Sequence, residues 1–280
     1  MTPSSLSAAR VSCTLAAAAV AAAMLLTPAA AQGKAAQGKA VPLKVTSTLD
    51  GLPFLPLRSR WIARPSVSAA SISSVTFTID GTLRWTEKAA PYVYAGDAGF
   101  LITTWLAPGR HIFTATVTTK DGRKVSDSVV TRVGRAPNPP AALTGVWARR
   151  QTRADQRRAG ETQSLLAAGK TRLYRIAFDR VGAWVLNPAG GGAVEQIGVV
   201  GNTINVFAPV EMNPTGAGVA AYGARGIGGA VCGDGGPAVR SFPPGSFRWA
   251  VRGNTLTLSH VRAGCSTRQA IWDGTWTRVQ

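Results

Sequence analysis

Apolar and polar residues alternate with a period of two along much of the chain, which is typical of β-strands with one buried face. The segment 111–117 places His111 with apolar residues on one face and threonines on the other. Val75–Ile79 alternates likewise and ends at Asp80-Gly81, a dipeptide typical of a hairpin turn. The pattern also predicts strands at 58–64, 99–105 and 124–133, the last preceded by Asp121-Gly122.

The second half of the chain is also rich in predicted strands. Gly201-Asn202-Thr203 and Gly253-Asn254-Thr255 occupy matching hairpin positions. Glu161–Ala168 is the only stretch we expect to be helical, and the glycine-rich residues 212–240 predict a long irregular loop. The predicted strands cover residues 173–178, 183–186, 204–208, 247–251 and 256–261.

Two segments divide the chain. Residues 32–40 read QGKAAQGKA, which predicts a flexible spacer, and residues 134–140 read GRAPNPP, which predicts an extended linker. We therefore expect an all-β protein with one β domain at 41–133 and a second at 141–280.

The first 31 residues have the three parts of an export signal. Arg10 provides the positive start, Thr14–Leu26 is an uncharged apolar core, and Ala29-Ala30-Ala31 offers the small residues of a cleavage site. The apolar core is too short to span a bilayer. We expect a secreted or cell-surface protein that starts near Gln32 and has no transmembrane span after cleavage.

The composition excludes several classes. With 45% hydrophobic residues the chain can bury a core, and 31 basic against 13 acidic residues give a net charge of +18. This balance argues against a calcium-loop protein and favours anionic partners. Export leaves Cys232 and Cys265, which predict one structural disulfide worth about 3–4 kcal/mol. Two cysteines and two widely separated histidines predict no metal site, and we expect no cofactor.

One segment resembles a known extracellular module. Residues 106–133 read LAPGRHIFTATVTTKDGRKVSDSVVTRV and are similar to the last two strands of bacterial extracellular Ig-like domains. The resemblance implies an Ig-like β-sandwich over 41–133 that serves as a spacer or docking module, and no chemistry.

The second domain begins and ends with the same motif. Gly145, Trp147 and Arg149 near its start match Gly274, Trp276 and Arg278 at its end, both as Gly-x-Trp-x-Arg. Each set falls on one face of a strand, and first and last strands are neighbours in a closed up-and-down barrel. Gly-x-Trp resembles the first-strand motif of lipocalins, which implies a lipocalin-like or calycin-like barrel. A second β-sandwich is the alternative.

The interior of such a barrel is the candidate ligand site. Alternation places an aromatic and apolar set on the inner faces, and a lumen lined in this way suits a small apolar or amphipathic molecule. The alternative is that these side chains fill the interior completely. A structural role is also the alternative for His260. The predicted lumen residues are Tyr174, Phe178, Phe247, Trp249 and His260.

The sequence offers little that indicates catalysis. Cys232–Pro237 resembles the nucleophile loop of trypsin-like proteases, but the serine is missing. There is no phosphate-binding loop, dinucleotide fingerprint or paired-carboxylate pattern. His111 alternates with apolar residues, which favours a structural histidine. An enzyme assembled from distant residues remains a further alternative.

A cluster of arginines follows the first Gly-x-Trp-x-Arg motif and is a candidate anion-binding site. Five arginines accompany a single aspartate there, and guanidinium groups bind phosphate and sulfate well. A solvated loop is the alternative. We expect non-enzymatic binding of a small ligand in the barrel, or else of an anionic cell-envelope polymer, and no nucleic-acid partner. The cluster comprises Arg149, Arg150, Arg153, Arg157 and Arg158.

Overall fold

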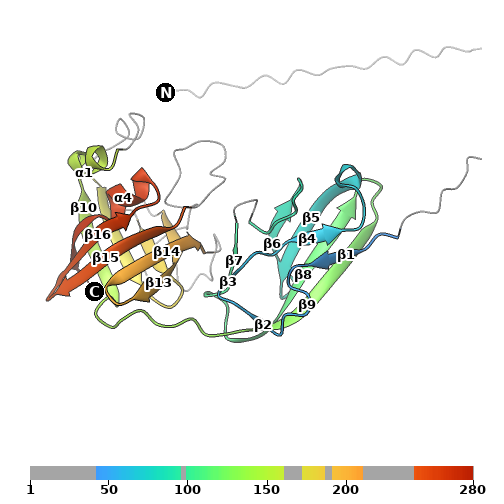
Figure 1. Cartoon of the computed structure of the whole chain (residues 1–280), viewed down its shortest axis with the longest axis horizontal. Helices are drawn as coiled ribbons and strands as arrows, with labels where there is room; N and C mark the ends of the chain where they lie inside the picture. Colours follow the sequence, from blue (N-terminus) through green and yellow to red (C-terminus); the bar gives the residue numbers. More distant parts are fainter. Residues whose placement is uncertain (1–41, 96–98, 161–171, 187–190, 211–242, 280) are drawn as a thin grey trace, which may run out of the picture. The chain divides into compact units, whose positions relative to one another are not determined.

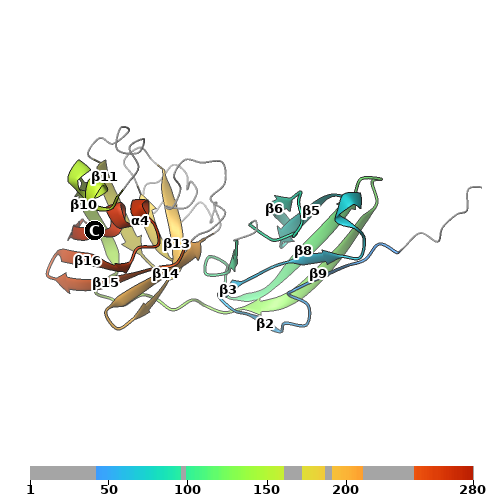
Figure 2. The same cartoon turned by 45° about the horizontal axis from the view of Figure 1, so that its top comes forward.

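The computed structural model describes residues 42–95, 99–160, 172–186, 191–210 and 243–279. The protein is all-β, as predicted, with a closed eight-stranded antiparallel barrel and sandwich-like sheets (Figures 1 and 2). Within the described residues, no helix has the length and apolar character needed to cross a membrane. The predicted signal, spacer and 161–168 helix lie outside the described residues, as do nearly all of the predicted 212–240 loop and Cys232.

The sandwich-like sheets lie between residues 45 and 133. Their largest member has five strands in the order β2-β9-β8-β5-β6, and two small sheets pair β1 with β4 and β3 with β7. The strands are β1 (Val45–Ser47), β2 (Phe54–Leu55), β3 (Arg58–Ser59), β4 (Ala63–Pro65), β5 (Ile72–Ile79), β6 (Thr82–Glu87), β7 (Leu101–Ile102), β8 (Gly109–Thr119) and β9 (Lys124–Val133).

The alternating pattern of this half is confirmed. In β8 the side chains of Phe113, Ala115 and Val117 are buried, while the threonines between them are only partly buried. The two predicted Asp-Gly hairpins connect β5 with β6 and β8 with β9. Period-two alternation therefore identified β5, β8 and β9 and the buried face of β8, whereas the segments predicted as strands at 58–64 and 99–105 contain only the short strands β3, β4 and β7.

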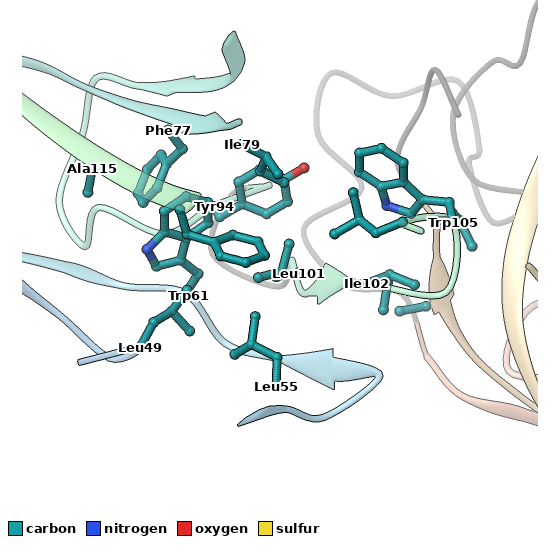
Figure 3. Packing of buried hydrophobic residues seen from close by; sticks show 14 of the residues in the cluster. Leu49, Leu55, Trp61, Phe77, Ile79, Tyr94, Leu101, Ile102, Trp105 and Ala115 are labelled. Atoms are coloured by element: carbon teal, nitrogen blue, oxygen red, sulfur yellow. The ribbon is translucent and has the colours of Figure 1, made fainter. Parts of the chain in front are cut away.

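Trp61 is at the centre of the core of these sheets (Figure 3). Its ring stacks on Tyr94 with centroids 5.6 Å apart and meets Phe77 edge to face at 4.8 Å. Phe113 packs against a further edge of the indole at 5.5 Å. Such aromatic pairs add about 0.5–1.5 kcal/mol each beyond the burial of apolar area.

The barrel runs up and down, so each strand pairs with the next in sequence and β17 closes onto β10. Helix α1 (Arg153–Arg158) follows the first strand, and α4 (Ser266–Trp272) precedes the last. The strands are β10 (Gly145–Gln151), β11 (Arg172–Phe178), β12 (Ala183–Leu186), β13 (Gly192–Val200), β14 (Thr203–Pro209), β15 (Gly245–Arg252), β16 (Thr255–Arg262) and β17 (Gly274–Arg278).

The expectation that 161–168 is the only helix is wrong, because the described residues contain α1 and α4. Helix α1 begins with a capping box, in which the Thr152 side chain accepts from the Asp155 N–H and Asp155 accepts from the Thr152 N–H. Cys265 is the N-cap of helix α4, and its Sγ accepts from the Arg268 N–H at 3.4 Å. Both helices span fewer than two full turns. Neither is therefore long enough to show a helical apolar period in the sequence.

The two Gly-x-Trp-x-Arg motifs occupy equivalent places on the closing strands. Trp147 and Trp276 are both fully buried in the barrel. The indole Nε1 of Trp147 donates to the Leu143 carbonyl at 2.9 Å, and that of Trp276 donates to the Trp272 carbonyl at 2.9 Å. Each ring therefore bonds the residue four positions before it.

The motif arginines close the barrel reciprocally. Arg278 donates to the carbonyls of Ala142 and Thr144, just before the first motif, and its guanidinium lies 4.1 Å from the centre of the Trp147 ring. Arg149 donates to the carbonyls of Ala270 and Ile271, just before the second motif, at 3.0 and 2.9 Å. We call these contacts the arginine latch.

A buried ion pair connects α4 with the opposite wall. The Arg268 Nε and Nη2 atoms donate to the two carboxylate oxygens of Glu195 on β13, each at 3.0 Å, and neither side chain has any exposed area. Nη1 of Arg268 donates to the carbonyls of Pro243 and Ala263. Because every charged atom of the pair has partners, the pair holds α4 in one position across the barrel end.

The His111–Asp80 pair makes the stability of the sandwich-like sheets depend on pH. Both ring nitrogens of His111 face acceptors at 2.7 Å, Asp80 and the Ala107 carbonyl, which favours the imidazolium. Burial lowers the pKa of His111, but the hydrogen bond and charge of Asp80 and the Ala107 carbonyl raise it further, so its pKa is above the ordinary value. Burial likewise raises the pKa of Asp80, but His111, the Ile112 N–H and Arg84 bring it below the ordinary value.

We therefore expect the pair to stabilise the fold most between about pH 4 and pH 6.5. Its contribution is lost as the pH rises through the raised pKa of His111, and again as the pH falls through the lowered pKa of Asp80. Since Asp80 is half exposed, the loss between pH 6 and 8 should be about 0.5–1 kcal/mol. Urea unfolding of wild type and His111→Asn at both pH values measures it, and an identical pH dependence in the variant contradicts the assignment.

Gly274 should tolerate no side chain, because it is where the arginine latch meets the backbone. Its φ is +127°, and a Cβ there would lie 2.6 Å from Nε of Arg149. Gly253, at φ +55° with open space around it, is the matched control. Gly253→Ala should cost about 1 kcal/mol of unfolding free energy from backbone strain alone. Gly274→Ala should cost at least about 2 kcal/mol, and equal losses in urea unfolding would contradict the latch.

Candidate functional site

Three of the predicted lumen residues lie in a packed interior. Phe178 and Phe247 are fully buried, and Tyr174 nearly so. Trp272 of α4 stacks on Phe247 with centroids 4.9 Å apart and meets Phe178 edge to face at 6.2 Å. The last residue of α4 thus occupies the lumen beside them, and ligand binding there stays a prediction.

The other two lie near the surface. Trp249 is partly buried, and its Nε1 donates to the Gly201 carbonyl at 3.2 Å. His260 lies on the same face as the buried Leu258, but its side chain is 41% exposed because β16 extends past the packed interior. The five predicted residues therefore do not form one cluster.

His260 instead forms a dyad with Asp273, a residue that sequence reasoning missed. Asp273 follows α4 directly, and its two carboxylate oxygens accept from the backbone N–H of His260 at 2.6 Å and contact its Nδ1 at 2.5 Å. The carboxylate thereby fixes the imidazole, with Nε2 directed away from the pair.

A pocket of about 220 Å³ lies beside this dyad. Helix α1 supplies one wall, α4 supplies another, and β16 and β17 supply the remainder. Asp273 and Ser259, the neighbour of His260, belong to the lining, which places the dyad at the edge of the pocket. The lining residues are Asp155, Arg158, Ala159, Leu258, Ser259, Gln269, Ala270, Asp273 and Gly274.

Arg149 fixes helix α1, which forms one wall of the pocket, through an ion pair with Asp155. Its Nη2 lies 3.0 Å from Oδ1 of Asp155, and Arg158 contacts the same oxygen at 3.2 Å. Burial lowers the pKa of Arg149 below its ordinary value, although Asp155 and Asp273 oppose this. Burial raises the pKa of Asp155, but Thr152, Arg149 and Arg158 together bring it below the ordinary value. Both groups are therefore charged near neutral pH.

The groups left over in the pocket are mainly donors. Both oxygens of Asp155 accept from Thr152 or the two arginines, and both oxygens of Asp273 face His260. Within the described residues, the side chains of Ser259 and Gln269 have no hydrogen bond, and Arg158 is 73% exposed with unused N–H groups. The pocket therefore suits a ligand with several acceptor atoms.

The carboxylates in the described part of the barrel are all engaged internally. Glu195 holds Arg268, Asp155 holds Arg149 and Arg158, and Asp273 holds His260. Asp179 accepts from the Val181 and Gly182 N–H groups and from Nε1 of Trp184. The described part of the barrel contains thirteen arginines and no lysine. Most of these arginines therefore have no described carboxylate available to pair with.

The arginines gather on one side of the barrel. Five consecutive strands, β15-β16-β17-β10-β11, contain no carboxylate, whereas β12, β13 and β14 contain no basic residue. Within the described residues none of the exposed arginines on these five strands forms an ion pair. We call this surface the arginine face; it consists of Arg150, Arg175, Arg248, Arg252 and Arg262, while the exposed Arg172 lies at the barrel end on the same face of β11 as Tyr174.

Hydroxyl groups fill the middle of the arginine face. On β16 and β17, between the arginines of β15 and those of β10 and β11, the outward side chains are Ser and Thr, apart from the exposed Val261 near the end of β16. Thr255 pairs in register with Thr277, and Thr257 pairs with Thr275. The surface therefore combines cationic donors with neutral hydroxyl donors and lacks acidic groups.

The predicted arginine cluster divides between two environments. Arg150 belongs to the arginine face, and Arg153, Arg157 and Arg158 are exposed on α1. Arg149 is buried and held by α4 and Asp155, so it is structural and not part of a binding surface. Period-two alternation could have predicted this difference, because Arg149 and Arg150 are adjacent on β10 and so point to opposite faces.

The remaining site predictions concern cysteines and metals. Cys265 caps α4, while its predicted partner Cys232 lies outside the described residues, so their disulfide stays a prediction. Among the described residues, His, Cys, Asp and Glu form no group of three or more that would hold a metal ion.

No known protein family and no curated protein matches the sequence. Among solved structures, the chain is similar to the fibronectin(III)-like modules of Clostridium thermocellum CbhA. The sequences are 23% identical over 34% of this chain and 100% of that chain, with a TM-score of 0.28. This likeness carries no inference about function.

Proposed function

We propose that this is an exported, non-enzymatic binding protein whose barrel holds an extended anionic polymer of the cell envelope against its arginine face. The observation that carries the proposal is the absence of acidic residues from five consecutive strands that bear six exposed arginines. The sandwich-like sheets act as a spacer or docking module.

The chemistry of the surface favours phosphate or carboxylate groups. A guanidinium presents a planar fork of N–H donors that binds either group through two hydrogen bonds, which lysine cannot do. The hydroxyls of Thr255, Thr257, Thr275 and Thr277 add neutral donors between the arginines. Such a surface binds acceptor-rich partners without internal competition from carboxylates.

The spacing of the arginines suits a repeating ligand. Arg248 and Arg252 lie four residues apart on β15, a separation of about 13 Å along a strand. Arg150 on β10 and Arg175 on β11 are close to diagonal neighbours, since Arg175 pairs in register with Ala148. Several charges spread over four of these five strands favour a polymer over a single small anion, because each further contact reduces the tendency to dissociate.

A small amphipathic ligand in the lumen is the second candidate function. One observation favours it: among the described residues, Nε1 of the fully buried Trp272 has no hydrogen-bond partner, and an acceptor atom of a ligand would satisfy it. Native mass spectrometry of the protein purified from its own culture medium should then detect a bound small molecule. The mass of the bare chain, together with no response of an apolar dye, would contradict this second function.

Removing four charges from the arginine face should weaken polymer binding strongly. We expect the quadruple variant Arg150→Gln, Arg175→Gln, Arg248→Gln and Arg252→Gln to lose at least about tenfold in affinity for polyphosphate or polygalacturonate. Wild-type binding should weaken steeply as salt rises from 50 to 300 mM, because the contacts are exposed. Fluorescence anisotropy with labelled polymer measures both effects.

A matched variant separates the arginine face from net charge. Arg64→Gln, Arg110→Gln, Lys124→Gln and Arg132→Gln remove four exposed charges from the sandwich-like sheets. This control should bind polymer within about twofold of wild type at 150 mM salt, where the Debye length is about 8 Å. Equal losses in the two quadruple variants would contradict a binding face on the barrel.

A further inference from the structure

The pocket between α1 and α4 is a second site that adjoins the arginine face. Its lining residue Ser259 pairs in register with Arg248 of that face, and its groups come from two helices and two strands. Its volume of about 220 Å³ is below the range of pockets that take drug-sized ligands. The size fits a single small group, either free or at the end of a larger molecule.

We propose that this pocket binds a terminal phosphate group, as a phosphate monoester or as the free ion. The unused groups that line it are the guanidinium of Arg158 on α1, the amide of Gln269 on α4 and the hydroxyl of Ser259 on β16. They come from three elements, and each can donate a hydrogen bond. A phosphate monoester offers three terminal oxygens as acceptors, whereas a carboxylate offers two.

The acidic lining residues do not repel this ligand in the way their number suggests. Asp155 is neutralised by Arg149 and Arg158, and its oxygens already accept from Thr152 as well. The oxygens of Asp273 both face His260, at 2.5 and 2.6 Å. Each oxygen of both carboxylates therefore already has at least one partner, and Arg158 retains N–H groups for an anion.

The floor and the rigidity of the pocket also support a built site. Ala159 and Ala270 supply apolar surface beside the unused donors. Arg149 joins both helices to the barrel wall through Asp155 and the carbonyls of Ala270 and Ile271. The donors are thus held in place before any ligand arrives, which reduces the entropy lost on binding.

Isothermal titration calorimetry with the full chain tests the proposal. Inorganic phosphate and glycerol phosphate are the probes, and acetate and the bis-glycerol phosphate diester are the comparators. We expect phosphate or its monoester to bind with a Kd of about 0.1–1 mM. The diester and acetate should bind at least about tenfold more weakly, because each lacks the third terminal oxygen.

Two variants and a matched control assign the binding to the pocket. Arg158→Gln should weaken phosphate binding about tenfold or more, and Gln269→Ala should weaken it about threefold to tenfold. Arg157→Gln removes the same charge from the adjacent position of α1, exposed and outside the lining, and should change binding less than twofold.

The outcomes separate the sources of the phosphate and the two proposed sites. Monoester binding as tight as that of inorganic phosphate identifies an end group of a larger molecule, and binding of inorganic phosphate alone identifies the free ion. Equal losses in Arg157→Gln and Arg158→Gln, or no heat with 10 mM phosphate, overturn the proposal. A triple variant of the arginine face that spares Arg248, namely Arg150→Gln, Arg175→Gln and Arg252→Gln, should keep its phosphate affinity, so the failure of one site is distinguishable from failure of the other.

Discussion

Closure of the barrel depends on the arginine latch. Strands β10 and β11 pair along the whole of Gly145–Gln151, but β10 and β17 pair in register only at Trp147 with Arg278 and Ala148 with Thr277. A short backbone ladder between the first and last strands leaves carbonyl groups near the seam that need donors. Arg278 supplies them at one end of the seam, and Arg149 supplies them at the other.

The latch also determines the rest of the barrel end. Because Arg149 is buried, its charge requires a partner, and Asp155 is that partner; this fixes α1 through the capping box with Thr152. The same guanidinium bonds the last turn of α4, where a cation is favourable for a helix. Helix α4 then directs Trp272 into the lumen and places Asp273 beside His260. A structural requirement at the seam therefore gives rise to the walls of the pocket.

The sequence predicted those parts of the molecule that depend on local alternation. The strands, the Asp-Gly hairpins and the meeting of the two Gly-x-Trp-x-Arg motifs follow from a period of two and from the repeat. Helix α4 was not predicted because it has only seven residues and buries a charged residue of its own, Arg268, so it shows no amphipathic period. The dyad of His260 and Asp273 escaped because its members lie thirteen residues apart across that helix.

The charge of the barrel is better explained by a partner than by stability. Exposed arginines without carboxylates repel one another, so six of them on four of these five adjacent strands lower the stability of the folded chain slightly. Their stems cover some apolar surface, but uncharged side chains would do the same without repulsion. Meanwhile the described carboxylates of the barrel are held by Arg149, Arg158, Arg268, His260 or backbone N–H groups, where they stabilise the fold. A surface that keeps its arginines free while its acids are all engaged is suited to accept negative charge from outside, and neutralisation by an anionic partner removes the repulsion.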